Sequence, residues 1–369
     1  MQNNEVYLHN ITTCVPEKSY SQDFALDFML KLQGDTEKKR SFLKRLYKGT
    51  AINKRHTVID DYDKEPAEFQ FYPKNHDFKP EPSTKKRNDL YIKESNRLSL
   101  KASEDLFSQL DNFDTDKITH LITISCTGFS APGFDLYLCK KLNLNPSVTR
   151  YHIGFMGCYA AFTGMKLART ICLAEKNAKV LMINVELCSL HFQHVFDLDI
   201  VVANSIFSDG ISAALITNDI NDSSGSKILL KNFFSQYVED SEDDMAWRIG
   251  DHGFDMKLSV YVPKIIEQNI NTYMQFLFRQ AGLEKKDIDI WAIHPGGSAI
   301  LRKIESVLAI SPQDLSISYS VLKEFGNMSS TTIMFVLQRI MANTVFGNIF
   351  AVAFGPGLTI ETGYLKKIQ

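Results

Sequence analysis

The chain has 369 residues, of which 44% are hydrophobic and 23% charged, and its formal net charge is -2. This composition is typical of a globular protein with one large core or two fused cores. The near-neutral charge argues against a general nucleic-acid binder and against a protein of anionic membrane surfaces. The first residues, MQNNEVYLHN, carry no signal-peptide pattern, and no apolar run reaches the roughly 18 residues of a membrane span.

The cysteines and histidines give no sign of a disulfide framework or of a metal. The sequence holds six cysteines and no CxxC pair. A chain of this size does not need disulfides for stability, so we expect reduced thiols and a cytoplasmic location. His191 and His194 lie close in sequence, but no third ligand accompanies them, and we expect both to be structural.

The first part of the chain predicts a strand over residues 5–16 and a helix over 22–32. The segment 38–55 is rich in lysine and arginine, and it could either bind phosphates or form a solvated helix. Residues 59–95 are polar and contain several prolines, which predicts an irregular excursion over the surface. A helix over 97–110 follows.

Residues 120–125, HLITIS, predict a short buried strand, after which strands and helices alternate. The stretch 151–193 is the one around which the chain is organised. Cys158 follows two glycines and opens a helix with small apolar residues at helical spacing, which permits deep burial. In the first turn of a helix the dipole lowers the pKa of a thiol and favours the thiolate, although a buried structural cysteine is the alternative. Residues 179–187 are apolar on both faces, which predicts a central strand.

A turn-forming polar cluster at residues 219–226 predicts a boundary between two halves, 1–222 and 223–369. The second half repeats the order of strand and helix, with a helix over 262–282 and a strand that ends at His294.

Asn327 stands at the start of a further amphipathic helix. The chain closes with two strands joined by a glycine-rich turn, in which Gly355 and Gly357 allow a close approach of the backbone.

Three polar residues thus stand at the ends of predicted buried elements: Cys158, His294 and Asn327. In open sheets, ligands bind outside the carboxyl ends of the strands, so we expect the three to share one site. An imidazole beside a thiol supports acyl capture as a thioester. Imidazole and carboxamide N–H groups can also stabilise an enolate, as in decarboxylation of a malonyl thioester. Together these steps form carbon–carbon bonds.

The sequence resembles the type III polyketide synthases, the chalcone synthase-like branch of the thiolase superfamily. The resemblance covers nearly the whole chain. Its markers are MGCYA around Cys158, ELCSLHFQ from Glu186, FSDG from Phe207, WAIHPGG around His294, FGNMSS around Asn327 and FGPGLTIE from Phe354. It implies an α/β fold with the αβαβα layers of the thiolases, built from two similar halves, and a homodimer in which Ala131 takes the place of a side chain that crosses the interface.

The resemblance also implies roles for individual residues. Cys158 would hold the growing chain, while His294 and Asn327 would assist loading, decarboxylation and condensation. Acyl-CoA and malonyl-CoA would be the substrates, with no further cofactor. Phe207 matches a gatekeeper between the CoA tunnel and the cavity, and Met256 stands where plant members have a second phenylalanine; Met would make this neck more pliable.

Further positions correspond to residues of the cavity or of the CoA site. The positions expected to line the cavity are Cys126, Cys188, Leu190, Ser329 and Trp247. Trp247 replaces a glycine of the plant enzymes and would fill volume. Arg45 matches a CoA-phosphate contact, and Lys48, with Lys44, is a less direct match.

The products expected are alkylresorcinols or alkylpyrones from fatty-acyl starters. A malonyl-primed tetrahydroxynaphthalene-type synthase is an alternative, because SCTGF with Cys126 resembles that subgroup. A condensing enzyme like ketoacyl-ACP synthase III, which shares the Cys, His and Asn residues, is another. A catalytically silent partner subunit is the alternative outside enzymes. A degradative thiolase is excluded, because it needs a second cysteine near the C-terminal glycine-rich turn, and no cysteine follows Cys188.

Overall fold

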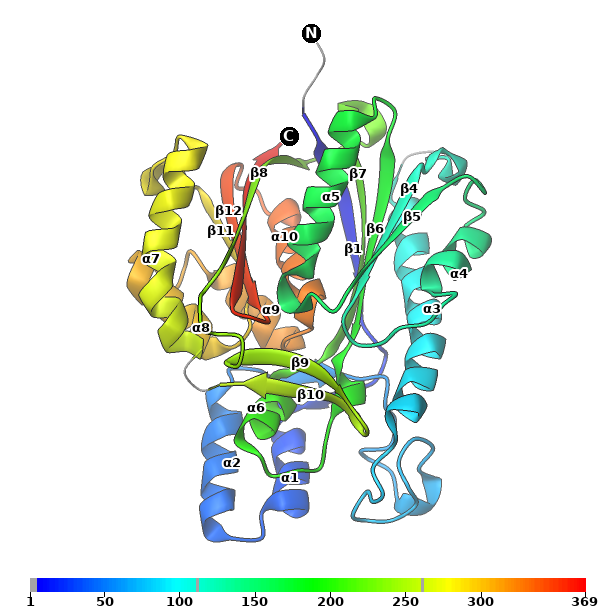
Figure 1. The fold of residues 1–369 in the computed structure, drawn as a ribbon, viewed down its shortest axis with the longest axis vertical. Coiled ribbons are helices and arrows are strands. Elements are labelled where there is room, and N and C mark those ends of the chain that lie inside the picture. The colour runs from blue at the N-terminus through cyan, green and yellow to red at the C-terminus, as the bar shows by residue number, and fades with distance from the viewer. Residues whose placement is uncertain (1–4, 111–112, 260–261) are drawn as a thin grey trace.

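The computed structural model describes residues 5–110, 113–259 and 262–369 (Figure 1). The helices are α1 (Gln22–Gln33), α2 (Glu37–Gly49), α3 (Thr84–Ser108), α4 (Phe134–Lys141), α5 (Ala160–Ala174), α6 (Leu198–Ile206), α7 (Val262–Ala281), α8 (Ser298–Leu308), α9 (Ser316–Phe325) and α10 (Thr332–Ala342). The strands are β1 (Tyr7–Cys14), β2 (Ser19–Ser21), β3 (Lys54–His56), β4 (His120–Ser125), β5 (Thr149–Gly154), β6 (Lys179–Leu187), β7 (Asp209–Thr217), β8 (Lys227–Tyr237), β9 (Met245–Gly250), β10 (Gly253–Leu258), β11 (Ile290–Ile293), β12 (Gly347–Gly355) and β13 (Thr359–Ile368).

The main sheet contains strands from both parts of the chain. Its nine strands run in the order β11-β12-β13-β8-β1-β7-β6-β4-β5. Within this sheet, the strands before residue 220 meet those after it where Tyr7 and Leu8 of β1 pair with Leu229 and Ile228 of β8. The boundary between 222 and 223 stays a prediction, since the sheet is continuous through this short pairing.

The layers follow from the alternation of side chains along buried strands. On β6, Val180 and Met182 pack with α5 and α10, whereas Leu181 and Ile183 pack with α3 and α4. On β12 the alternate residues pack either with α5 and α10 or with α7 and α8. Figure 1 shows α3 and α4 on one side, α7 and α8 on the other, and α5 and α10 between. The predicted αβαβα order is confirmed.

Helix α5 can occupy the central layer because its buried face is made of small residues. A Cβ atom added at Gly164 would lie 2.4 Å from Cδ1 of Ile124 and 2.8 Å from Sδ of Met182, side chains of β4 and β6. The helix therefore packs closer to the sheet than a larger residue would permit. This contact fixes the position of the N-terminal end of α5, where Cys158 lies.

The prediction that residues 59–95 are irregular is wrong for their last part. Helix α3 begins at Thr84, and the side chain of Ser83 caps it by accepting a hydrogen bond from the amide of Lys86. The inward face of its first turns carries polar side chains such as Arg87 and Glu94, which are buried. The sequence of these turns therefore lacks the apolar periodicity from which a helix is predicted.

Helix α9 and the β9–β10 hairpin were not predicted. The hairpin lies apart from the main sheet, and its tip is tied to α3, where the amide of Thr84 donates to the carbonyl of Asp251 at 2.8 Å. Figure 1 shows the hairpin passing across the molecule below the main sheet. Within the described ranges, no helix is long and apolar enough to cross a bilayer.

Candidate active site

Cys158 lies in a single 3-10 turn, Gly157–Tyr159, directly before α5. This 3-10 turn packs closely against the glycine-rich turn that follows β12. Gly157 has a φ of +77°, and a Cβ atom there would lie 2.2 Å from Cδ of Pro356. At Gly355 a Cβ atom would lie 3.3 Å from the backbone nitrogen of Cys158. The glycines at both positions thus allow the two turns to meet at the thiol.

His294 directly follows β11, where its amide donates to the carbonyl of Val352 at 2.8 Å. The side chain is buried, and within the described residues neither ring nitrogen has a hydrogen-bond partner. Burial lowers the pKa of His294 to about 3, so the ring is neutral near pH 7. A neutral imidazole without a protein partner can accept a proton from a bound ligand or donate one to it.

Asn327 is held by backbone and side-chain hydrogen bonds. Its amide donates to the carbonyl of Ile206, and its carbonyl accepts from the amide of Ser208, both at 2.9 Å. Its side-chain oxygen accepts from the amide of Ser329 at 2.9 Å, while Nδ2 donates to the carbonyl of Gly296 at 3.1 Å. The helix predicted to begin at Asn327 starts at Thr332, after a 3-10 turn.

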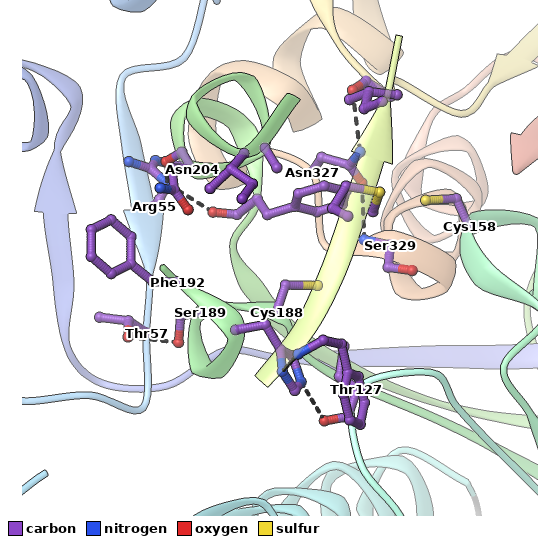
Figure 2. A pocket seen from close by; sticks show the side chains of 18 of the residues that line it. Arg55, Thr57, Thr127, Cys158, Cys188, Ser189, Phe192, Asn204, Asn327 and Ser329 are labelled. Atoms are coloured by element: carbon purple, nitrogen blue, oxygen red, sulfur yellow. Dashed lines mark hydrogen bonds between the residues drawn. The ribbon is translucent and has the colours of Figure 1, made fainter. Parts of the chain in front are cut away.

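One cavity of about 1450 Å³, part of it open to solvent, contacts all three side chains. Figure 2 shows Cys158, Asn327 and Ser329 on one side of it and Arg55, Thr57 and Phe192 on the other. Its lining also includes the predicted positions Cys126, Cys188, Phe207, Trp247 and Met256. The structure therefore brings together residues that are far apart in the sequence.

The prediction that Leu190 lines this cavity is wrong. The segment from Cys188 to His191 is a 3-10 turn with three residues per turn, so Cys188 and His191 point the same way. Both line the cavity, whereas Leu190 is fully buried in the core between α3 and the sheet. His191, expected to be structural only, is a lining residue that the sequence analysis missed.

Arg45 and Lys48 do not line the cavity; both are exposed on α2. Tyr47, on the opposite face of the same helix, does line it. The start of α8 approaches the end of α2, where Oγ of Ser298 donates to the carbonyl of Gly49 at 2.7 Å. Most of the basic segment thus forms α2, a helix beside the cavity, and its last residues enter β3.

Cys158 does not have the low pKa that its position at the start of a helix predicts. Burial raises the pKa of Cys158 to about 12, and the nearby carboxyl of Glu186 acts in the same direction, while hydrogen bonds from Ser329 and Asn327 oppose it only in part. Because His294 is neutral as well, it supplies no positive charge to stabilise a thiolate of Cys158. The desolvation of the thiol exceeds the effect of the helix dipole.

Glu186, at the end of β6, is a buried carboxyl behind the cavity. One oxygen accepts from the amide of Cys126 at 3.0 Å, and the hydroxyls of Thr127 and Ser330 also donate to the carboxyl. Sγ of Cys126 lies 3.2 Å from this carboxyl and 3.2 Å from Oγ of Ser329. Burial raises the pKa of Glu186 to about 7. These bonds hold Cys126 and Ser329 in place in the cavity wall.

An aromatic wall lines the cavity beside Cys126 and Thr127. The rings of His191 and Phe254 are stacked with centroids 4.0 Å apart, and Trp247 packs edge-on against both. Nε1 of Trp247 donates to the carbonyl of Cys126 at 2.6 Å. Nε2 of His191 lies 2.8 Å from the carbonyl of Thr127, and Nδ1 accepts from the amide of Phe254, which assigns the proton to Nε2. Trp247 fills space at this wall and also fixes it.

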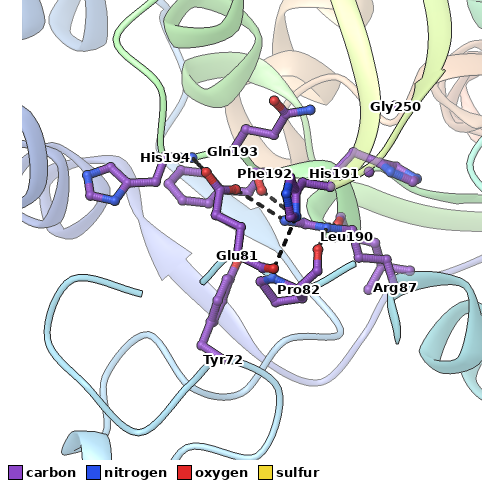
Figure 3. A network of polar contacts seen from close by, with 12 residues as sticks. Tyr72, Glu81, Pro82, Arg87, Leu190, His191, Phe192, Gln193, His194 and Gly250 are labelled. Carbon is purple, nitrogen blue, oxygen red and sulfur yellow. Dashed lines mark hydrogen bonds and ion pairs between the residues drawn. The ribbon is translucent and has the colours of Figure 1, made fainter. Parts of the chain in front are cut away.

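Arg87, fully buried, fixes the segment that carries His191 and Phe192 (Figure 3). Its guanidinium donates to the carbonyls of Leu190, Phe192 and Pro82 and forms an ion pair with Glu81 at 3.3 Å. The sequence analysis missed it, since an arginine in a polar helix carries no signal of burial. Across the described ranges no cluster of His, Cys, Asp and Glu could hold a metal, and His194 bonds elsewhere, to the carbonyl of Asp77.

Comparison with known proteins identifies the family. The model for the N-terminal domain of chalcone and stilbene synthases matches residues 2–220, and the model for the C-terminal domain matches residues 230–369. The chain is 30% identical over 361 residues to the alpha-pyrone synthesis polyketide synthase-like Pks18 of Mycobacterium tuberculosis, covering 96% of this chain and 89% of that protein.

Two solved structures share the fold. PKS-I of the brown alga Ectocarpus siliculosus has a TM-score of 0.89 at 28% identity, covering 99% of this chain and 98% of that one. The C-terminal type III polyketide synthase domain of Steely1, a type I/III hybrid from Dictyostelium, has a TM-score of 0.90 at 26% identity, covering 99% and 100%. The chain therefore belongs to the chalcone and stilbene synthase family, has a thiolase-like fold, and is a type III polyketide synthase, a transferase.

The close contact between the two turns at the thiol gives a stability prediction. Gly157→Ala places a Cβ against Pro356 at a positive φ, so we expect a loss of about 2–4 kcal/mol in the free energy of unfolding, measured by urea denaturation. Gly49→Ala is the matched control, because nothing lies within 4 Å of its added Cβ. Equal stabilities of the two variants would contradict the contact.

The raised pKa of Cys158 predicts how its reactivity depends on pH. The thiolate is a small fraction at neutral pH and grows until the pH passes the pKa, so alkylation of the free protein by iodoacetamide should accelerate about tenfold per unit between about pH 7 and pH 9. The rate is measured by mass spectrometry of the peptide that contains Cys158. A rate that is already constant below about pH 7 would instead indicate a thiolate–imidazolium pair.

Proposed function

We propose that the protein loads a fatty-acyl-CoA starter on Cys158, extends it by decarboxylative condensation with malonyl-CoA, and cyclises the chain to an alkylpyrone or alkylresorcinol. The observation that carries this proposal is the position of Cys158, His294 and Asn327 around one largely apolar cavity. CoA thioesters would be the only substrates, with no added cofactor.

In the loading step, a ring nitrogen of His294 takes the proton of the Cys158 thiol while sulfur attacks the thioester carbonyl of the starter. Burial keeps both groups neutral, so proton transfer would accompany attack rather than precede it. The carbon–sulfur bond to CoA breaks, and the imidazolium returns the proton to the leaving CoA thiolate. The starter is then a thioester of Cys158.

In the extension step, malonyl-CoA loses CO2 and leaves the enolate of acetyl-CoA. The N–H of neutral His294 and the Nδ2–H of Asn327 would stabilise the enolate oxygen. Asn327 is suited to this role, because its side-chain oxygen is bound to the amide of Ser329 and its Nδ2 atom therefore has a fixed orientation. The enolate carbon attacks the Cys158 thioester, the thiolate leaves, and the lengthened chain is now on CoA.

The entry and shape of the cavity would be set by the remaining predicted residues. We assign Phe207 and Met256 to the neck, since both line the cavity that also contacts the catalytic residues, and the backbone of Phe207 pairs with that of Asn327. Arg45 and Lys48 would bind CoA phosphates at the surface. Cys126, Cys188, Ser329 and Trp247 would surround the growing chain.

The product class rests on the apolar character of the cavity, which suits an alkyl chain better than a starter made only of malonyl units. The similarity to Pks18, whose name refers to alpha-pyrone synthesis, is in keeping with a pyrone product. The tetrahydroxynaphthalene-type alternative rests on Cys126 alone, and that thiol lies against Glu186 and Ser329. The ketoacyl synthase alternative differs from the proposal in its acyl carrier.

We also propose a cytoplasmic homodimer formed through β5. This strand is at the edge of the main sheet, and its residues 149–152 and 154 are exposed. Tyr151 is 40% exposed, and Ala131 is exposed as well. An uncovered edge strand can pair with a second copy.

The reaction is tested with the purified protein, labelled malonyl-CoA and a panel of acyl-CoA starters, with product masses determined by mass spectrometry. We expect alkylated polyketides from long-chain starters, and a loss of all products in Cys158→Ala, because the thioester cannot form. Cys172→Ala is the matched control, since Cys172 is buried in the core away from the cavity. Turnover only with an acyl carrier protein, or products made only from malonyl-CoA, would contradict the proposal.

The homodimer is tested by size-exclusion chromatography with light scattering. We expect a mass of about twice 41.9 kDa, and a shift to the monomer in Tyr151→Arg, because like charges would face each other across the paired strands. Tyr237→Arg, at a residue that is 66% exposed, is the control and should leave the mass unchanged. A monomeric parent protein would contradict this assembly.

A further inference from the structure

An arginine in the cavity wall has no part in the reaction proposed above. Arg55 is the central residue of β3 and lines the cavity, yet its guanidinium donates hydrogen bonds to protein atoms. We propose that Arg55, supported by Gln22, is a positioning residue that holds Asn327 in the place needed for decarboxylation of malonyl-CoA. This inference rests on the proposed function and adds the residues through which Asn327 is placed.

The contacts of Arg55 are at the C-terminal end of α6 (Figure 2). The last carbonyls of a helix have no partner within the helix, so each needs a donor from outside it. Nη1 of Arg55 donates to the carbonyl of Asn204 at 2.8 Å and to that of Phe207 at 2.9 Å. Its positive charge also lies at the negative end of the helix dipole. Arg55 therefore fixes this helix end by hydrogen bonding and by charge.

Gln22, the first residue of α1, binds the same helix end. Its Nε2 atom donates to the carbonyl of Ser205 at 2.8 Å, and its Oε1 atom accepts from Nε of Arg55 at 3.0 Å. The neighbouring carbonyl, that of Ile206, accepts from the amide of Asn327 at 2.9 Å. Successive carbonyls at the end of α6 are thus bound by Arg55, Gln22 and Asn327. The backbone of Asn327 rests on a helix end that the other two residues hold.

The stem of Arg55 also packs against the residue before Asn327. A Cβ atom added at Gly326 would lie 3.0 Å from Cγ and 3.3 Å from Cδ of Arg55. Gly326 has a φ of +71°, and it lies between the end of α9 and Asn327. Arg55 therefore contacts both segments of the backbone pairing between Phe207 and Asn327.

Backbone contacts extend this arrangement by one residue. The amide of His56 donates to Oγ of Ser208 at 2.8 Å, and the hydroxyl of Ser208 donates to the carbonyl of His56 at 3.1 Å. The amide of Ser208 in turn donates to the carbonyl of Asn327. The segments around residues 55, 207 and 327 therefore lie side by side. Loss of the Arg55 side chain loosens the middle segment, with which Asn327 pairs.

The chemical consequence follows from the part of Asn327 in the extension step. The bond between the carboxylate carbon and the α-carbon of malonyl-CoA breaks, CO2 leaves, and the electron pair stays on the enolate. Without an acyl group on Cys158, a solvent proton then gives acetyl-CoA. A misplacement of about 1 Å can cost roughly a hundredfold in rate, so this step is sensitive to where Nδ2 of Asn327 lies. In the loading step the proton moves between Cys158 and His294, so loading depends less on Asn327.

The first experiment measures two partial reactions by mass spectrometry: acylation of Cys158 by hexanoyl-CoA, and formation of acetyl-CoA from malonyl-CoA. We expect Arg55→Met to lower kcat for decarboxylation about thirtyfold, with less than about a threefold change in its KM and in the rate of acylation. Arg55→Lys retains a cation that can donate to the carbonyls of α6, and it should restore decarboxylation to within about fivefold of the unaltered protein. Equal losses in the two partial reactions would overturn the inference.

The matched control for this experiment is Arg97→Met. Arg97 is on α3, where it forms ion pairs with Glu17 and Glu94 outside the lining of the cavity. We expect this variant to leave both partial reactions unchanged. A loss of decarboxylation as large as that of Arg55→Met would mean that the effect is not specific to Arg55, and it would overturn the inference as well.

A double-mutant cycle tests whether Arg55 acts through Asn327. If it does, Arg55→Met costs about thirtyfold in decarboxylation when Asn327 is present, but less than about twofold in the Asn327→Ala background. The reason is that the group to be positioned is already missing there. The same thirtyfold loss in both backgrounds would show that Arg55 acts independently of Asn327.

The second experiment needs neither a substrate nor a change at Arg55, so it stays decisive if Arg55→Met does not fold. Hydrogen exchange is followed by mass spectrometry in Gln22→Leu. We expect peptides that contain residues 206–208 and 327 to exchange about tenfold faster than in the unaltered protein, while those of α5 keep their rates. Gln109→Leu, at an exposed residue of the α3 end, is the control. Unchanged exchange in Gln22→Leu would contradict the support that Gln22 gives.

The failure of this inference differs from that of the proposed function. If the unaltered protein forms no acetyl-CoA from malonyl-CoA, or if Asn327→Ala forms it at the full rate, the proposed function fails and the inference falls with it. If Asn327→Ala loses decarboxylation but the losses from Arg55→Met multiply and the exchange rates do not change, only the positioning role of Arg55 is wrong.

Discussion

The site depends on a short backbone pairing between the two parts of the chain. The amide of Asn327 donates to the carbonyl of Ile206, and the amide of Ser208 donates to the carbonyl of Asn327. These bonds join the start of the α10 region to the end of α6, and they place Asn327 beside Phe207. The contact of Gly157 with Pro356 makes a second junction, between the turn of Cys158 and the turn after β12. The cavity exists because these junctions hold the two parts together around it.

Burial has a consequence for the charges in this site. Burial raises the pKa of Cys158 and lowers that of His294, and it raises the pKa of Glu186 and of Asp209 to about 7. Burying an unpaired charge costs far more than burying a neutral group, so the thiol of Cys158 and the imidazole of His294 are both neutral. In the proposed loading step, the thioester would supply the electrophile toward which the sulfur and its proton can move, which would couple ionisation to the arrival of substrate.

The sequence predicts the central layers well and the surroundings of the cavity less well. Strand β6 and helix α5 carry strong apolar patterns, and their ends bear the chemistry, so both elements and Cys158 could be predicted. The buried face of helix α3 carries polar residues such as Arg87, so it has no apolar pattern in the sequence. The partners of Arg87 come from residues 81, 82, 190 and 192. Those contacts exist only in the folded chain.

Leu190 and His191 show the same limit at the scale of one turn. A period of two continued from β6 would place Leu190 beside Cys188, but the 3-10 turn changes the period to three and turns His191 to the cavity. The local amino-acid composition does not indicate this change of period. The pKa of Cys158 is a further case, since the helix dipole can be read from the sequence, whereas the desolvation that outweighs it depends on the complete fold.

The two ends of the cavity are also built from different parts of the fold. Cys158, His294 and Asn327 are anchored to the central helices and to the sheet, where a change of volume disturbs the packed layers. The part of the cavity that is lined by Tyr20, Phe28 and Tyr62 is built mainly from β2, α1 and the loop that carries Tyr62, outside those layers. Its residues are only partly buried, so substitutions there cost less stability than those in the core. Under the proposed function, substitutions in this outer part would change the shape of the cavity while Cys158, His294 and Asn327 keep their positions.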